Sequence, residues 1–236
     1  MLLLPILTVM EYSVGNSFFD SHPTDLFGGI GDLSELGKKI CFEMGKIMGF
    51  DVLINNWDRL PLVWNNEGNL GNILVSNNLD HPITGIDNSI SSIHPINFKP
   101  KYDEYIGNVR ALIRELTTSD KPGPYIQKVR NFLITNLGYD IGEEGCQQIR
   151  NGLLAGIQVR FLKNDNFFLT FFKEIATKID RKLLEKTYAD IKGQVDYLLG
   201  RMAWGQDFQS LYGLVKINID FLDGVLTEFK EALNKK

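Results

Sequence analysis

Three residues whose side chains carry oxygen donors lie close together in the sequence: Asp58, Asn72 and Asp87. They are its clearest indication of chemistry. Carboxylate and amide oxygens are ligands that Mg²⁺ prefers, usually one or two of them together with phosphate oxygens and water. A carboxylate in a loop can also accept the proton of a hydroxyl group. Phosphoryl transfer needs little more from a protein, so the three residues predict phosphoryl transfer from a magnesium-bound nucleotide.

The segment NNWDRLPLVWNNEGNLGNILV, residues 55–75, places two of the chain's three tryptophans among asparagines. We expect Trp57 and Trp64 to wedge this loop against the helical part of the protein. Asp58 and Arg59 are candidate catalytic residues, and the alternative for this dipeptide is a structural ion pair. Other asparagines are predicted to form turns, because Asn tolerates left-handed backbone and bonds to nearby backbone groups: Asn65, Asn66 and Asn69.

The elements around the segment are predicted to bring the three residues together. Asp32-Leu33-Ser34 supplies a helix start, apolar residues then recur at three- and four-residue steps, and Gly49 is predicted to end this helix. The runs NILVS and PITGIDNS, separated by NNLDHP, predict a β-hairpin. The hairpin would set Asn72 and Asp87 side by side, facing Asp58, although a register shift of one residue would turn a side chain away.

Outside this region the sequence predicts a strand at the start and helices towards the end. Residues 3–12 form an apolar run that is too short to cross a bilayer, so a buried strand is expected. Residues 13–31 contain Gly, Pro, Ser and Asn and are predicted to be a flexible loop. From residue 102 onward, five segments with helical periodicity predict a helical body over 102–236.

Composition narrows the possible functions. The 236 residues carry a net charge of −4, with five Lys/Arg against eleven Asp/Glu in residues 1–100. This acidic half suits a cation site and argues against nucleic acid, which needs a basic surface. Cys41 and Cys146 have no metal-binding spacing, and the amino-terminal run lacks the features of a targeting segment, so we expect no membrane and a cytoplasmic location.

The ordered set TVMEY, GNSF, FDVLI, NNWDRLP, GNILV and GIDNS resembles the catalytic domain of the actin-fragmin kinase family over roughly residues 5–135. The resemblance implies an α+β, predominantly α fold: a protein-kinase-like C-terminal lobe with short β-hairpins. It places Asp58 and Arg59 in the catalytic loop, Asp58 being the base, and Asn72 and Asp87 at the metal. The implied cofactors are ATP and Mg²⁺, and the implied partner is a protein substrate, actin or an actin complex. The adenine-binding hinge falls on Met10, Glu11 and Tyr12.

The sequence departs from the pattern of protein kinases in several places. Asn56-Trp57 precede the catalytic Asp, and Asn88-Ser89 follow the second Asp in place of Phe-Gly. No Lys precedes Lys38, so we expect the N-terminal lobe with its Gly-rich loop and Lys to be largely missing. The chain is therefore expected to be one kinase-like domain, residues 1–236, with a hinge strand at 3–12, a catalytic and metal-binding segment at 50–90 and the helical body.

Such a chain would be truncated and inactive alone. It would bind ATP no better than about millimolar. Two alternatives stay open: a catalytically inactive kinase-like interaction module, and an atypical kinase that acts on a lipid or another small molecule.

Overall fold

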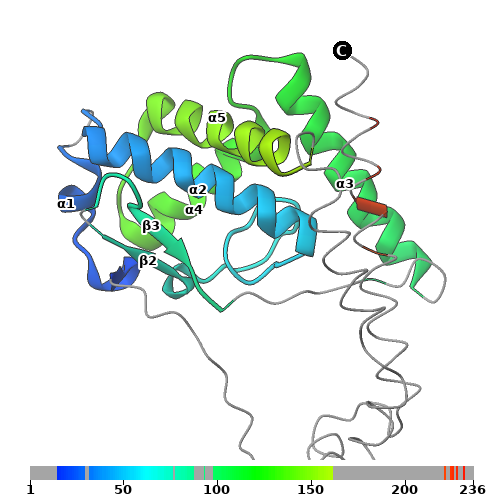
Figure 1. The fold of residues 1–236 in the computed structure, drawn as a ribbon, viewed down its shortest axis with the longest axis horizontal. Coiled ribbons are helices and arrows are strands. Elements are labelled where there is room, and N and C mark those ends of the chain that lie inside the picture. Colours follow the sequence, from blue (N-terminus) through cyan, green and yellow to red (C-terminus); the bar gives the residue numbers. More distant parts are fainter. Residues whose placement is uncertain are drawn as a thin grey trace, which may run out of the picture.

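A computed structural model describes residues 15–29, 32–76, 78–87, 93 and 98–161, and also 221, 224, 225, 227 and 231 (Figure 1). The predicted hinge strand 3–12, with Met10, Glu11 and Tyr12, lies outside these residues. So do Asn88, Ser89 and most of the predicted helical segments beyond residue 161.

The described part is rich in helix and has one small sheet, which confirms the predicted α+β organisation. The sheet is antiparallel, with the order β1-β2-β3. None of the described helices is long and apolar enough to span a membrane. In chain order the elements are β1 (Asn16–Ser17), the 3₁₀ helix η1 (Phe18–Asp20), α1 (Pro23–Phe27), α2 (Glu35–Ile54), the 3₁₀ helix η2 (Leu70–Asn72), β2 (Ile73–Val75), β3 (Ile83–Gly85), α3 (Lys99–Thr118), α4 (Pro124–Leu137) and α5 (Gly142–Phe161).

The prediction of a flexible loop over residues 13–31 is wrong for its described part, which contains β1, η1 and α1. Buried aromatic residues explain why this segment forms regular structure. Phe18 and Phe27 are completely buried, and their rings lie 6.0 Å apart. The ring of Phe27 also stacks on that of Tyr139, which follows α4, at 5.1 Å. The segment therefore buries its own aromatics against the helical body.

Helix α2 starts as predicted but runs past Gly49. The Ser34 hydroxyl accepts a hydrogen bond from the Gly37 amide at 3.0 Å and caps the first turn. The helix continues to Ile54, where Asn55 ends it in the left-handed conformation at φ 52°. Gly49 does not end the helix. It lies where α2 packs against α5, and a Cβ there would lie 3.4 Å from the Ile157 amide nitrogen.

Helices α2 and α5 lie side by side (Figure 1). Glycines allow this close approach. A Cβ at Gly45 would lie 2.1 Å from the Ile149 carbonyl oxygen, and one at Gly152 would lie 1.8 Å from the Phe42 carbonyl oxygen. These helix backbones therefore touch directly, and the pair forms a rigid base for the loop that follows α2.

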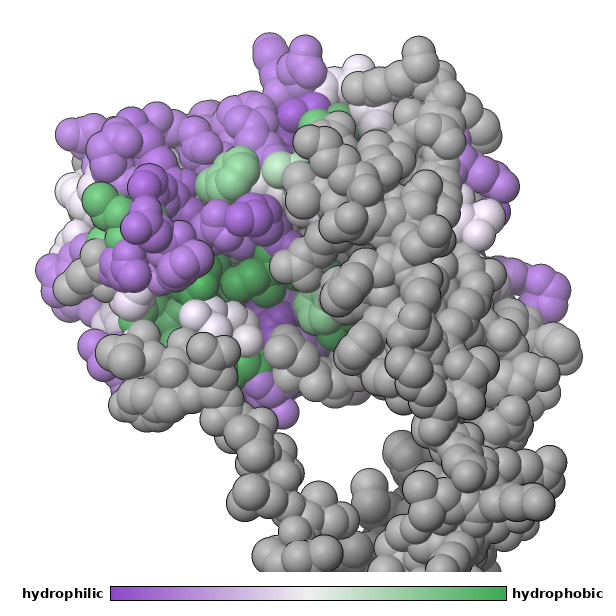
Figure 2. Space-filling view, in the orientation of Figure 1, coloured by the Kyte–Doolittle hydropathy of each residue, from purple (hydrophilic) through white to green (hydrophobic). Residues whose placement is uncertain are grey.

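The sheet packs under α2 and completes one hydrophobic core with α3, α4 and α5. In the hairpin, Ile73 pairs with Gly85 and Val75 with Ile83. Figure 2 shows a mostly polar surface over α2 and a hydrophobic patch below it, in the region of the sheet. The sheet is thus held from one side by the helices, and this fixes the hairpin that carries two of the predicted site residues.

Candidate functional site

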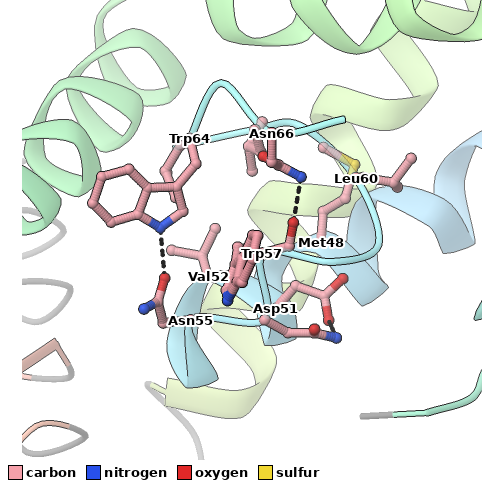
Figure 3. A pocket seen from close by; sticks show the side chains of 11 residues that line it. Met48, Asp51, Val52, Asn55, Trp57, Leu60, Trp64 and Asn66 are labelled. Carbon is pink, nitrogen blue, oxygen red and sulfur yellow. Dashed lines mark hydrogen bonds between the residues drawn. The ribbon is translucent and has the colours of Figure 1, made fainter. Parts of the chain in front are cut away.

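The loop of residues 55–69 begins where α2 ends. Trp64 anchors the start of this loop. The Trp64 indole donates from Nε1 to Asn55 Oδ1 at 2.7 Å (Figure 3). Its ring stacks on Tyr105 of α3 with the centroids 5.6 Å apart. The prediction that Trp64 wedges the loop is confirmed. The same prediction for Trp57 is wrong, because its side chain is 55% exposed.

Two helical side chains far along the sequence also hold loop 55–69. Lys128 of α4 donates from Nζ to the carbonyl oxygens of Leu62 (2.7 Å) and Trp64 (3.3 Å). Asn108 of α3 donates from Nδ2 to the Val63 carbonyl oxygen at 3.0 Å. Partial removal from water lowers the pKa of Lys128 below its usual value. Sequence reasoning missed both residues, since no local pattern marks a lysine or asparagine that binds 45 to 66 residues away.

Asp58 and Asn72 are in direct contact, as the sequence predicted. The Asn72 amide donates from Nδ2 to Asp58 Oδ2 at 2.7 Å. Asn72 is buried at the end of η2, whereas the Asp58 side chain is exposed at the surface. A hydrogen bond from a fixed, buried amide orients the carboxylate while leaving it open to a ligand from solution.

Asp87 lies just beyond the hairpin on the opposite strand. The Ile86 amide donates to the Asn72 carbonyl oxygen at 3.0 Å, which extends the β2–β3 ladder by one step. Asp87 is exposed and adopts a left-handed backbone at φ 51°, a conformation that Asp tolerates better than most residues. The predicted hairpin is therefore present and pairs Asn72 with Ile86, the residue before Asp87.

Arg59 lies behind the site and not on its surface. Its side chain is completely buried and forms an ion pair with Asp51 near the end of α2. It donates from Nε to the Asn72 carbonyl oxygen at 3.1 Å and from Nη2 to the Ile86 carbonyl oxygen at 2.8 Å. The guanidinium therefore joins α2 to both sides of the hairpin. Its burial excludes the direct substrate contact that a catalytic role for Arg59 would require.

Gly85 makes room for this arginine. A Cβ at Gly85 would lie 3.1 Å from Arg59 Cζ and 3.2 Å from Nη2, closer than most Cβ contacts. No local sequence pattern marks this contact, because the pairing of Asp51 with Arg59 depends on where α2 ends.

The interior of loop 55–69 is tightly packed. A cavity of about 10 Å³ lies between the loop and residues Met48, Asp51 and Val52 of α2 (Figure 3). This is space for about one water molecule. Asn66 crosses the loop and donates from Nδ2 to the Trp57 carbonyl oxygen. Such packing keeps the backbone before and after Asp58 in one conformation.

The donor set fits a hard cation that keeps part of its water shell. Because the Asn72 amide presents nitrogen to Asp58, its Oδ1 is the atom left for a cation, and Asp87 is an exposed carboxylate one residue beyond Ile86, which bonds to the Asn72 backbone. Within the described residues, no three His, Cys, Asp or Glu side chains cluster as an all-protein metal site would require. One amide and one or two carboxylates suit Mg²⁺ that is also bound by phosphate and water.

The comparisons with known proteins agree in one family. The profile of the family described as "Actin-fragmin kinase, catalytic" matches residues 1–157. Two Dictyostelium discoideum proteins, both named provisionally as actin-fragmin kinases, are similar to nearly the whole chain. One is 25% identical over 231 residues, covering 95% of this chain and 49% of the relative. The other is 24% identical over 235 residues, covering 96% and 49%. The chain thus spans about half the length of these curated relatives.

Proposed function

The chain belongs to the actin-fragmin kinase catalytic family, and from this premise we propose that it transfers a phosphoryl group from Mg-ATP to a hydroxyl of a protein substrate. The proposed substrate is actin or an actin complex, following the family and the names of the relatives. We propose further that the described elements belong to the C-terminal lobe of a protein-kinase-like fold, and that Met10, Glu11 and Tyr12 bind the adenine.

The observation that carries the proposal is the 2.7 Å hydrogen bond between Asn72 Nδ2 and Asp58 Oδ2. It joins the proposed base to the proposed metal-binding hairpin, as an enzyme needs if the hydroxyl and the phosphate are to meet. Asp58 accepts the proton of the acceptor hydroxyl. Asn72 Oδ1 and Asp87 would hold Mg²⁺, which would neutralise charge on the phosphates when bound.

Arg59 takes a positioning role in this proposal. Its bonds to the carbonyl oxygens of Asn72 and Ile86 fix the hairpin against the loop that carries Asp58. Asp51 balances the buried positive charge from α2. The pair keeps proposed base and proposed metal ligands in register without contacting the substrate.

The test is transfer of γ-phosphate to actin by the full-length product of the gene that encodes this chain. Asp58→Asn keeps the shape of the side chain but cannot accept the proton, so the rate should fall by about 10²–10⁴-fold. Nucleotide affinity should change little, because Asp58 faces the acceptor. Glu67→Gln is the matched control, since Glu67 is an exposed carboxylate of the same loop.

A rate within about threefold of the unmodified protein for Asp58→Asn would refute the proposed role. No transfer to actin by the unmodified protein, with Mg-ATP binding intact, would instead favour the alternative of an inactive interaction module.

A further inference from the structure

A second, larger pocket opens beside loop 55–69, on the side that faces the start of α3. Its volume is about 500 Å³, and its walls include Trp57, Trp64, Asn65, Ile93, Lys101 and Glu104. This is enough space for one or two large side chains. Asp58 is not part of the lining, but Trp57 directly precedes it in the chain, so the pocket opens one residue away from the proposed base.

The two tryptophans of the pocket differ in how available their rings are to a ligand. Trp64 already makes contacts within the protein, since its indole nitrogen donates to Asn55 and Lys101 Nζ lies 5.7 Å from its ring centroid. Trp57 is 55% exposed and makes no ring stacking or cation–π contact among the described residues. Its π face is therefore available to a ligand.

The pocket lining contains one acidic and one basic side chain, Glu104 and Lys101, and Glu104 is the one open to a ligand. Glu104 is exposed on α3 and forms no ion pair within the part of the chain that the structure describes. The nearby lysine, Lys101, already rests over Trp64. An open indole face beside an available carboxylate is complementary to a guanidinium or ammonium group.

We propose that this pocket binds an Arg or Lys side chain of the acceptor protein, close in sequence to the hydroxyl that is phosphorylated. The proposal rests on the proposed function, because it places that hydroxyl at Asp58. An extended chain rises about 3.3 Å per residue, so a side chain that enters beside Trp57 comes from a few residues away. Trp57 and Glu104 would be the specificity-determining residues.

The test measures binding of fluorescein-labelled peptides to the 236-residue chain by fluorescence anisotropy. Each peptide has a central Thr in an Ala background, with Arg, Glu or Ala at one position within four residues on either side. The best Arg peptide should bind about tenfold more tightly than its Ala counterpart. Trp57→Ala and Glu104→Gln should each remove most of this preference.

Reversing the charge at Glu104 gives the most direct test of the preference for a positively charged side chain. Glu104→Lys should transfer the preference to the Glu peptide at the same position. Asp103→Lys is the matched control, because it makes the same charge change one residue away, outside the pocket lining and at a residue paired with Lys99. Equal binding of all peptides, no binding of any peptide, or equal effects of the two reversals would overturn the proposal.

Failure of the proposed function would look different. The same peptides can be offered to the full-length gene product with Mg-ATP. Transfer that is absent, or insensitive to Asp58→Asn, refutes the kinase proposal even where the Arg preference persists. Transfer that depends on Asp58 but ignores Arg and Glu104 refutes only the pocket.

Discussion

At the scale of single residues, the site depends on one buried amide with two tasks. Asn72 gives its nitrogen to Asp58 Oδ2 and its backbone carbonyl oxygen to both Arg59 and the Ile86 amide. The position of the side chain is thus set by the backbone bonds behind it. The same backbone bonds determine where a ligand of Asn72 Oδ1 would lie. The proposed metal site therefore requires the hairpin in this register.

Replacing Asp87 should separate metal binding from base catalysis. Asp87→Asn keeps the size of the side chain and tolerates the left-handed backbone at this position, but it removes the negative charge. Mg²⁺-dependent ATP binding by the full-length gene product should weaken by at least about tenfold, or about 1.4 kcal/mol. Isothermal titration with and without Mg²⁺ measures this. Asp80→Asn, in the exposed turn of the same hairpin, is the control, and equal losses in both variants would contradict the assignment.

The buried pair of Arg59 and Asp51 should be essential to stability as a pair. Arg59→Met leaves the Asp51 carboxylate buried without its cationic partner, and Asp51→Leu leaves the guanidinium likewise. Each should lower the free energy of unfolding by about 3–5 kcal/mol. The double variant should lose clearly less than the sum. Urea unfolding followed by circular dichroism is the measurement, and additive losses would show that the two side chains act independently.

At the scale of elements, the sequence predicted the hairpin better than the end of the helix before it. The hairpin followed from two apolar runs around a turn, and its period of two fixed which residues share a face. The end of α2 could not be predicted, because Gly49 resembles a helix terminator and only the presence of α5 explains it as a packing residue. Because the helix was predicted to end at Gly49, the sequence did not indicate that Asp51 would be the partner of Arg59.

The two tryptophans show the same limit. Trp57 and Trp64 have equal intrinsic tendencies to be buried, and the sequence around them gives no reason to separate them. Their fates differ because Tyr105 of α3 provides a stacking surface for Trp64. A contact between residues 41 positions apart is decided by tertiary packing, which no local pattern records.

The glycine contact between α2 and α5 gives a prediction at this scale. Gly152→Ala would place a methyl group 1.8 Å from the Phe42 carbonyl oxygen, and backbone on both sides leaves nothing flexible to move. It should destabilise the protein by about 1–3 kcal/mol. Gly107→Ala in α3 is the matched control, since a Cβ there meets nothing within 4 Å, and it should stabilise by about 0.5–1 kcal/mol. Thermal unfolding of both variants tests the difference, and similar shifts would contradict the close approach of the helices.

At the scale of the whole molecule, the loop with Asp58 is held by parts of the chain that are distant in sequence. Lys128 of α4 and Asn108 of α3 fix its backbone, Trp64 packs on α3, and α2 leads into it. The site is thus as rigid as the helical body beneath it. Opening of the body should therefore disturb the site.

The two cysteines report on that opening. Cys41 of α2 and Cys146 of α5 are free and completely buried where these helices meet. Burial raises the pKa of the Cys146 thiol to about 11 and raises the pKa of the Cys41 thiol as well. At pH 8 both thiols are therefore protonated in the folded protein, and a thiolate forms readily only after exposure. Reaction with Ellman's reagent should be slow for both thiols in buffer and complete within the mixing time in 6 M guanidinium.

Gly152→Ala should accelerate both reactions together, because it weakens the shared α2–α5 contact, whereas Gly107→Ala should not. Fast labelling of one thiol in the unmodified protein would mean that its helix opens separately from the other.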